Sequence, residues 1–218
     1  MIKITDLTKI YKNKRGIRNI SLTIKTGDIL GLLGPNGSGK TTIMKAMLSL
    51  ISEDSGTIEV DGKPIHENYE QIMARTGALI ETPAIHKDLS AYDNLRLAAR
   101  SKNDLKDIDR VLEVVHLEHY RHDKAGRFSL GMKQRLGLAA AFLGNPEIII
   151  LDEPVNGLDI EGVVEIREYI KKLNSEYNTT FVISSHIASE IEKLSTSTAV
   201  IYDGELISHD TTKHIMSL

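Results

Sequence analysis

The 218-residue sequence contains no cysteine. The absence of thiols excludes a disulfide framework and any metal site built on cysteine ligands. Long apolar runs are also missing, because no stretch reaches the roughly 18 apolar residues of a membrane-spanning helix. The opening residues, Met-Ile-Lys-Ile-Thr-Asp, lack the pattern of a signal peptide. Together these absences favour a cytoplasmic protein.

Neither sign of charge is in large excess. The 27 Lys and Arg residues face 30 Asp and Glu residues, for a net charge of −3. This balance gives no electrostatic basis for binding nucleic acid. With 41% hydrophobic residues, the chain can bury the core of one α/β domain. We expect a single domain over residues 1–218, with a helical lobe inserted at approximately residues 90–145.

The most informative stretch is Gly34–Thr42, which matches the phosphate-binding pattern G-x-x-x-x-G-K-[ST]. An apolar run, Ile29–Leu33, precedes it and predicts a buried strand, and the spacing of the apolar residues that follow predicts a helix over 41–51. Glycines in such a turn let backbone N–H groups surround a phosphate at the positive end of a helix. The predicted phosphate-binding residues are Gly34, Asn36, Gly37, Ser38, Gly39, Lys40, Thr41 and Thr42.

Lys40 and Thr41 have particular roles in this prediction. Lys40 is expected to reach the β- and γ-phosphates as a catalytic cation, and the Thr41 hydroxyl to ligate Mg²⁺. The pattern indicates a nucleotide and Mg²⁺, and says nothing of how the energy is used. The alternative, a chance glycine-rich turn, is disfavoured by the flanking strand and helix.

Apolar strands alternate with helical patterns along the rest of the chain, which predicts a mostly parallel, doubly wound sheet. The strand Ile148–Leu151 ends in two carboxylates, Asp152 and Glu153. Asp152 is expected to hold Mg²⁺ and Glu153 to deprotonate the attacking water. His186 follows another strand, at 181–185, and is a candidate for sensing the γ-phosphate. A solvated strand end and a surface histidine are the plainer interpretations.

The ordered set of motifs resembles the ATP-binding subunit of an ABC transporter over essentially the whole chain. The set comprises Tyr11, Gly34–Thr42, Glu81, Phe128–Met132, Ile148–Glu153, Asn156–Asp159 and His186. The resemblance implies a P-loop core with an antiparallel β lobe and the inserted helical lobe. It also implies a head-to-tail dimer, formed with a second copy or with a second ATP-binding subunit, that closes on two ATP molecules.

The resemblance also assigns roles to single residues. Tyr11, which by itself suggests only a half-buried aromatic residue, would stack on adenine. Ser129 and Gly131 would bind the γ-phosphate of the ATP held by the other protomer. Asp159 would communicate across the dimer, and Glu81 would reach toward Mg²⁺.

Three positions depart from the family pattern. Leu130 and Met132 replace glycine and glutamine in the signature motif, and Leu130 adds bulk in a tight place. Glu81 stands where most of the family has glutamine, and in the context Ile80-Glu81-Thr82-Pro83 it resembles the subgroup that exports bacitracin or confers immunity to lantibiotics. Little follows the last predicted hairpin, so we expect no appended regulatory domain.

The sequence therefore predicts an ATPase that powers a separate integral membrane permease, docked on the inner face of the membrane and exporting a peptide antibiotic. The alternatives are a subunit of another ABC exporter or importer and a soluble ABC ATPase acting on DNA or ribosomes. Glu81 and Ser129 are separated by 48 positions, which is too short for the long coiled coil of chromosome clamps. A P-loop kinase is disfavoured by Asn156–Asp159 and His186.

Overall fold

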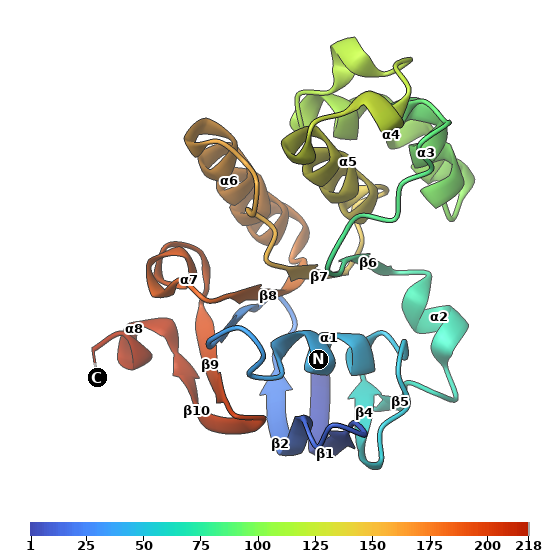
Figure 1. Ribbon diagram of the computed structural model, residues 1–218. Helices are drawn as coiled ribbons and strands as arrows, with labels where there is room; N and C mark the ends of the chain where they lie inside the picture. The colour runs from blue at the N-terminus through green and yellow to red at the C-terminus, as the bar shows by residue number, and fades with distance from the viewer. Residues whose placement is uncertain (218) are drawn as a thin grey trace. The chain divides into compact units, whose positions relative to one another are not determined.

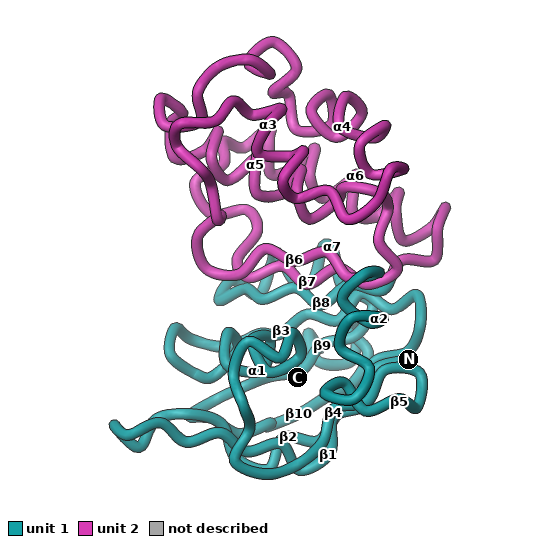
Figure 2. Tube along the Cα trace, turned by 90° about the vertical axis from the view of Figure 1, so that its right-hand side faces the viewer, with its two compact units in different colours: residues 1–75, 180–218 teal, residues 76–179 magenta. Residues whose placement is uncertain are grey.

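The computed structural model describes residues 1–217, and the chain divides into two units (Figure 2). Unit 1 consists of Met1–Arg75 and Thr180–Leu218, and unit 2 of Thr76–Thr179. Unit 2 is thus an insertion in the sequence of unit 1. Each unit contains parallel strands covered by helices, as the alternating sequence pattern predicts.

Unit 1 contains an antiparallel sheet in the order β2-β1-β4-β5. Its strands are β1 (Ile2–Ile10), β2 (Gly16–Ile24), β4 (Ser55–Val60) and β5 (Lys63–Pro64). Alternate residues of β1 and β2 are buried. On the apolar face, Ile2 pairs with Ile24 and Ile4 pairs with Leu22. The turn at 61–62 joins β4 to β5, as the Asp-Gly pair predicts. The expected antiparallel β lobe is confirmed.

Parallel strands form the second sheet segment of unit 1. Strand β3 (Ile29–Leu33) lies between β8 (Thr180–Ser185) and β9 (Ser197–Tyr202), parallel to both, and β10 (Glu205–Thr211) pairs with β9 in the opposite direction. The first four residues of β3 are buried, which explains its unbroken apolar sequence.

The helices of unit 1 are short. They are α1 (Lys40–Met47), α2 (Tyr69–Met73), α7 (Ala188–Leu194) and α8 (Thr212–Ile215). Helix α1 (Figure 1) contacts both β2 and β8. Its residues Ile43 and Met44 are fully buried. It ends four residues before the predicted Ile51, because Ser49 takes a left-handed conformation with φ 50°.

Unit 2 combines two parallel strands with helices. The strands are β6 (Thr76–Leu79) and β7 (Ile148–Asp152), and the α-helices are α3 (Ala91–Ala98), α4 (Lys102–Val114), α5 (Leu130–Phe142) and α6 (Ile160–Tyr177). Two short 3-10 helices, Glu118–Tyr120 and Ala125–Arg127, separate α4 from α5. Helix α5 contacts α3, α4, β6 and β7, so it packs against both the helices and the strands of unit 2.

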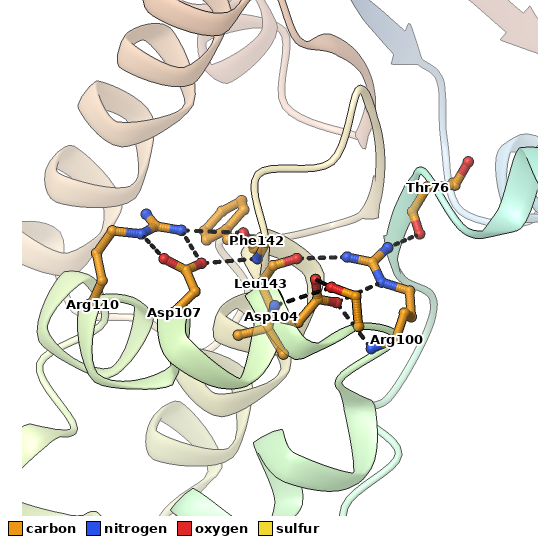
Figure 3. Close-up of polar contacts among 9 residues, drawn as sticks. Thr76, Arg100, Asp104, Asp107, Arg110, Phe142 and Leu143 are labelled. Carbon is orange, nitrogen blue, oxygen red and sulfur yellow. Dashed lines mark hydrogen bonds and ion pairs between the residues drawn. The ribbon is translucent and has the colours of Figure 1, made fainter.

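The C-terminal end of α5 is held by an arginine from the chain just before α4 (Figure 3). The Arg100 guanidinium donates hydrogen bonds to the Leu143 carbonyl at 2.5 Å and to the Thr76 carbonyl at 2.6 Å. Asp104, which is buried, accepts hydrogen bonds from the Arg100 guanidinium at 3.2 Å and from Ser101 at 2.6 Å. A cation at a helix C-terminus offsets the negative end of the helix dipole. This network therefore joins α4, α5 and the start of β6.

Candidate functional site

The loop Gly34–Thr42 connects β3 to α1 within unit 1. Gly39 is the N-cap of α1 with φ 111°, and a Cβ on it would lie 2.5 Å from Ile17 Cγ2. Both facts require glycine at this position. No side chain caps α1 and no acidic residue lies in its first turn. The N–H groups and the positive dipole end of α1 are therefore suited to an anion.

Two buried polar side chains of the loop fit a phosphate ligand. Lys40 is only 5% exposed, and its ammonium donates hydrogen bonds to the carbonyls of Gly34 at 2.8 Å and Pro35 at 3.1 Å. The Ser38 hydroxyl is buried and has no hydrogen-bond partner among residues 1–217. A buried hydroxyl without a partner is costly, and a phosphate oxygen would satisfy it. The buried donors of this loop thus suit a nucleotide phosphate.

His186 follows directly after β8, on the neighbouring strand to β3. The N–H of Gly34 donates to the Ser185 carbonyl at 3.4 Å, which brings the start of the phosphate loop to the end of β8. The Ser185 hydroxyl accepts from the N–H of Ile187 at 3.1 Å and donates to Glu190 at 2.5 Å. These bonds shape the turn that presents the exposed His186. The structure therefore brings His186 and the phosphate loop together in unit 1.

Tyr11 lies in the turn between β1 and β2 and is 38% exposed. Its N–H donates to the Arg15 carbonyl at 2.8 Å. The same turn leads to Gly16, whose carbonyl oxygen lies 3.6 Å from the position of a Cβ on Gly39. The turn that carries Tyr11 therefore reaches the phosphate loop, as stacking on the base of a bound nucleotide requires.

The turn between β9 and β10 also supports the phosphate loop. The N–H of Gly204 donates to the Ser38 carbonyl at 2.9 Å, and the Gly204 carbonyl accepts from the N–H of Arg18 at 2.8 Å. A residue near the end of the chain thus bridges the loop and β2. The Asp-Gly pair at 203–204 predicts the turn, but nothing local in the sequence indicates these contacts.

In unit 2 the signature motif forms the N-terminal end of α5. Ser129 is the N-cap, as predicted, and its hydroxyl accepts a hydrogen bond from the N–H of Met132 at 3.2 Å. A Cβ on Gly131 would lie 2.8 Å from the Gly157 carbonyl, so the motif packs against the turn at 156–159. Leu130 is 75% exposed, and within this chain its bulk projects outward without crowding the motif.

Asp159 is the N-cap of α6 and accepts a hydrogen bond from the Arg135 guanidinium at 3.0 Å. This hydrogen bond is the main reason that the pKa of the Asp159 carboxyl lies below its ordinary value. Arg135 belongs to α5 and also approaches Glu165 at 3.5 Å. The signature helix and the turn at Asn156–Asp159 are therefore joined by an ion pair that the sequence analysis did not include.

The two glutamates predicted for chemistry occupy equivalent places on neighbouring strands. In the parallel register Leu79 pairs with Leu151, and Glu81 and Glu153 each follow two residues later. Asp152 ends β7 and is buried. Because the carboxyl ends of parallel strands lie at one edge, the structure brings Glu81, Asp152 and Glu153 to the same edge of the β6–β7 pair.

Glu81 and Glu153 also share an unusual backbone. Their φ angles are 57° and 47°, in the left-handed region that costs a residue other than glycine about 1–3 kcal/mol. Several Asn and Asp residues of the described chain share this region, which their short side chains tolerate better. The longer side chain of glutamate does not stabilise the left-handed conformation in this way. The surrounding contacts must therefore hold both turns in place.

Gln134 provides one such contact. It is buried in α5, and its amide donates to the carbonyl of Pro154 at 3.0 Å and of Glu153 at 3.5 Å. The signature helix thus touches the turn that carries the predicted base. Gln134 is not among the predicted site residues, and its only signal in the sequence is a polar side chain among the apolar residues of a core helix.

The predicted residues fall into two groups. Unit 1 brings together Tyr11, His186 and the phosphate loop with Lys40, Thr41 and its other predicted members. Unit 2 brings together Ser129 and Gly131 with the turn at 156–159, and Glu81 with Asp152 and Glu153.

A phosphate loop between a buried parallel strand and a helix, in an α/β chain with a buried aspartate ending another strand, defines a P-loop nucleoside triphosphatase. Residues 17–156 match the family model described as ABC transporter. The chain belongs to the ABC transporter ATP-binding family, and it binds and hydrolyses ATP. The predicted fold class is confirmed as an ABC ATPase fold with mixed sheets and helices.

Two relatives and one solved structure illustrate the similarity. The chain is 44% identical to the bacitracin transport ATP-binding protein BcrA of Bacillus licheniformis, over 99% of this chain and 71% of the relative. It is 40% identical to the lantibiotic transport ATP-binding protein SrtF of Streptococcus pyogenes, over 95% of this chain and 89% of the relative. A dimeric post-hydrolysis ATP-binding cassette bound to ADP and Pi superposes with a TM-score of 0.87 and 26% identity, covering 97% of this chain and 99% of that one.

Among residues 1–217, no helix is both long enough and apolar enough to cross a bilayer.

Proposed function

We propose that this chain is the ATPase subunit that drives a separate membrane permease to export a peptide antibiotic of the bacitracin or lantibiotic class. One observation carries the proposal: relatives named for bacitracin transport and for lantibiotic transport match nearly the whole chain at 40–44% identity. Glu81 in its Ile80–Pro83 context supports the same subgroup. The chain would be held at the inner face of the membrane by the permease.

Each predicted residue of unit 1 contributes binding or orientation. The phosphate loop holds the phosphates through its N–H groups, with Ser38 and Lys40 as the buried side-chain donors. Tyr11 stacks on the base, and His186 contacts the γ-phosphate from the end of β8.

Thr41 in unit 1, and Asp152 and Glu81 in unit 2, each offer the hard oxygen that Mg²⁺ prefers as a ligand. When bound, Mg²⁺ offsets negative charge on the transferred phosphoryl group. The Glu153 carboxylate accepts the proton of the attacking water. The carbonyls of Glu153 and of the neighbouring Pro154 accept hydrogen bonds from the Gln134 amide, which holds the backbone that carries this carboxylate.

Ser129 and Gly131 lie at the N-terminal end of α5, which favours a phosphate for the same reason as α1. We infer that this end meets ATP bound to a second ATP-binding chain. The dimeric cassette structures support such an assembly for this family. Asp159, whose carboxylate accepts a hydrogen bond from the Arg135 guanidinium, lies beside the signature motif and would report closure.

The test has a genetic and a biochemical arm. Deleting the gene should sensitise the host to bacitracin or to one member of a lantibiotic panel, and the wild-type gene should restore resistance. Glu153→Gln should not restore it, because loss of the base lowers hydrolysis by about 10²-fold or more. The matched control is Glu161→Gln, because Glu161 is an exposed glutamate in the first turn of α6. Asp152→Glu is unsuitable as a control because Asp152 belongs to the proposed site. Unchanged susceptibility to the whole panel would refute the substrate class, and normal hydrolysis by Glu153→Gln would refute the assignment of the base.

A further inference from the structure

Gly137 is an unexpected residue in the middle of α5. It is buried, and the residues after it are Leu138, Ala139, Ala140 and Ala141, which all favour a helix more strongly than glycine does. A glycine that weakens a helix at a buried position needs a reason in packing. None of the predicted site residues explains it.

The reason is the close approach of Pro83. A Cβ on Gly137 would lie 2.7 Å from Pro83 Cγ, 2.8 Å from Pro83 Cβ and 2.9 Å from Leu79 Cδ1. The leucine methyl belongs to a flexible side chain and can rotate away. The proline atoms belong to a ring and cannot rotate independently of the backbone. An added methyl group would therefore move either α5 or the backbone at Pro83.

A displacement at Pro83 would reach Glu81, which is only two residues away. Proline restricts the conformation of Thr82 before it, so this short segment is stiff. Glu81 already occupies the left-handed region and depends on its surroundings to stay there. The strand before it is fixed on the same helix, because a Cβ on Gly77 would lie 1.9 Å from the Ala141 carbonyl.

We propose that Gly137 is a positioning residue for Glu81: the absence of a side chain at 137 lets Pro83 seat on α5, and the seated Pro83 fixes the carboxylate of Glu81. The inference rests on the proposed function in one respect, the role of Glu81 as a ligand of Mg²⁺. Its consequence is that the helix carrying the signature motif also sets the position of a metal ligand.

The test compares Gly137→Ala, Pro83→Gly and the double variant. Gly137→Ala should raise the Mg²⁺ concentration for half-maximal ATP hydrolysis about tenfold, as a lost supporting contact does at metal sites. The rate at saturating Mg²⁺ and the KM for ATP should change by less than about threefold, because the base and the phosphate loop are unaffected. In the Pro83→Gly background, adding Gly137→Ala should change the Mg²⁺ requirement by less than about twofold, since the clashing ring is gone.

A purely structural role gives different results. Alanine favours the helix more than glycine does, so Gly137→Ala without a clash would unfold at an equal or higher temperature and need no more Mg²⁺. An unchanged Mg²⁺ requirement in Gly137→Ala, while Glu81→Gln does raise it, would overturn the inference and leave the proposed function intact. Equal effects of Gly137→Ala with and without Pro83 would also overturn it.

A second measurement does not depend on the role of Glu81. Because the chain has no cysteine, Thr82→Cys introduces a single thiol at an exposed position for a nitroxide label. Gly137→Ala should change the mobility of this label, and Ala140→Ser, a small change on the same helix, should not. If Glu81→Gln leaves the Mg²⁺ requirement unchanged, the proposed metal role fails, and a changed label spectrum in Gly137→Ala still supports the positioning of the turn. An unchanged spectrum overturns it.

Discussion

The N-terminal ends of α1 and α5 differ from those of the other α-helices of five or more residues. Among the α-helices of five or more residues that the structure describes, α2, α3, α4, α6 and α7 each carry an acidic residue in the first turn. Helices α1 and α5 carry none. Acidic side chains there normally offset the positive end of the helix dipole. The two helices predicted to meet phosphate are those that leave this positive end for a ligand.

The two helix ends that we propose to bind phosphate also differ from each other. Helix α1 begins at Gly39 with no side-chain cap, whereas α5 begins at Ser129, whose hydroxyl caps Met132. At α1 the ligand must lie close to the backbone, and a buried lysine supplies the charge. At α5 the serine hydroxyl stays exposed and can serve both the helix and a ligand. We therefore expect the two ends to hold phosphate in different ways.

The largest effect is expected at α1. Lys40→Ala should lower ATP hydrolysis by about 10²-fold or more, because it removes a fixed cation from the phosphates. Lys45→Ala, in the last turn of the same helix, should stay within about twofold of wild type, as for most substitutions outside a site. Steady-state hydrolysis and equilibrium ATP binding measure both. Equal activity of the two variants would contradict the role given to Lys40.

A smaller effect is expected when α5 is made to resemble the other helices. Met132→Glu completes a capping box with Ser129 and should stabilise the protein by about 0.3–1.5 kcal/mol. It should nevertheless lower hydrolysis about tenfold, because the carboxylate repels the phosphate of the partner's ATP. Met132→Gln forms the same box without charge and is the control.

Thermal unfolding and ATPase assays on both Met132 variants separate the two contributions. If Met132→Glu and Met132→Gln hydrolyse ATP at the same rate, the N-terminal end of α5 does not meet phosphate during the reaction.

The smallest effect on hydrolysis is expected at α4, where the acidic residue is structural. Burial raises the pKa of Asp104, but hydrogen bonds from Ser101 and Arg100 outweigh it, and the net pKa is lowered. A carboxylate with a lowered pKa adds stability above its unfolded value of 3.8 and loses that contribution as pH falls through the folded value. Asp104→Asn should therefore lower the free energy of unfolding by about 1–3 kcal/mol near pH 7.

Urea denaturation at several pH values checks this prediction. The difference between wild type and Asp104→Asn should shrink below pH 3.8. Asp93→Asn is the matched control: it occupies the same place in α3, after Ser90, but its carboxylate is much more exposed than that of Asp104. A constant difference at all pH values would show that the charge of Asp104 does not stabilise the fold.

The features that the sequence predicted well have local causes. A serine before an apolar helix predicted the N-cap of α5, and two Asp-Gly pairs predicted the turns at 61–62 and 203–204. The phosphate loop has a fixed spacing because a strand, a turn and a helix must follow one another. In each case neighbouring residues alone determine the backbone.

The features that the sequence did not predict depend on contacts between residues that are distant in the sequence. Gln134 and Arg135 touch turns that lie 20 or more residues further along the chain, and no periodicity indicates such partners. Nothing local indicates that Glu81 and Glu153 would take positive φ angles, since tertiary contacts override the local preference of glutamate. The boundaries of the single predicted domain stay a prediction, and so do the roles of the individual site residues.

The hydrogen bond from Gly204 to Ser38 has a consequence for synthesis. The phosphate loop, residues 34–42, is translated before unit 2. Residues 180–204, which are translated after unit 2, supply both strands that flank β3 and the turn that supports Ser38. Because chains emerge from the ribosome N-terminus first, the loop lacks these neighbours while unit 2 is being translated. A nascent chain should thus acquire its affinity for ATP only after residues 180–204 have been translated.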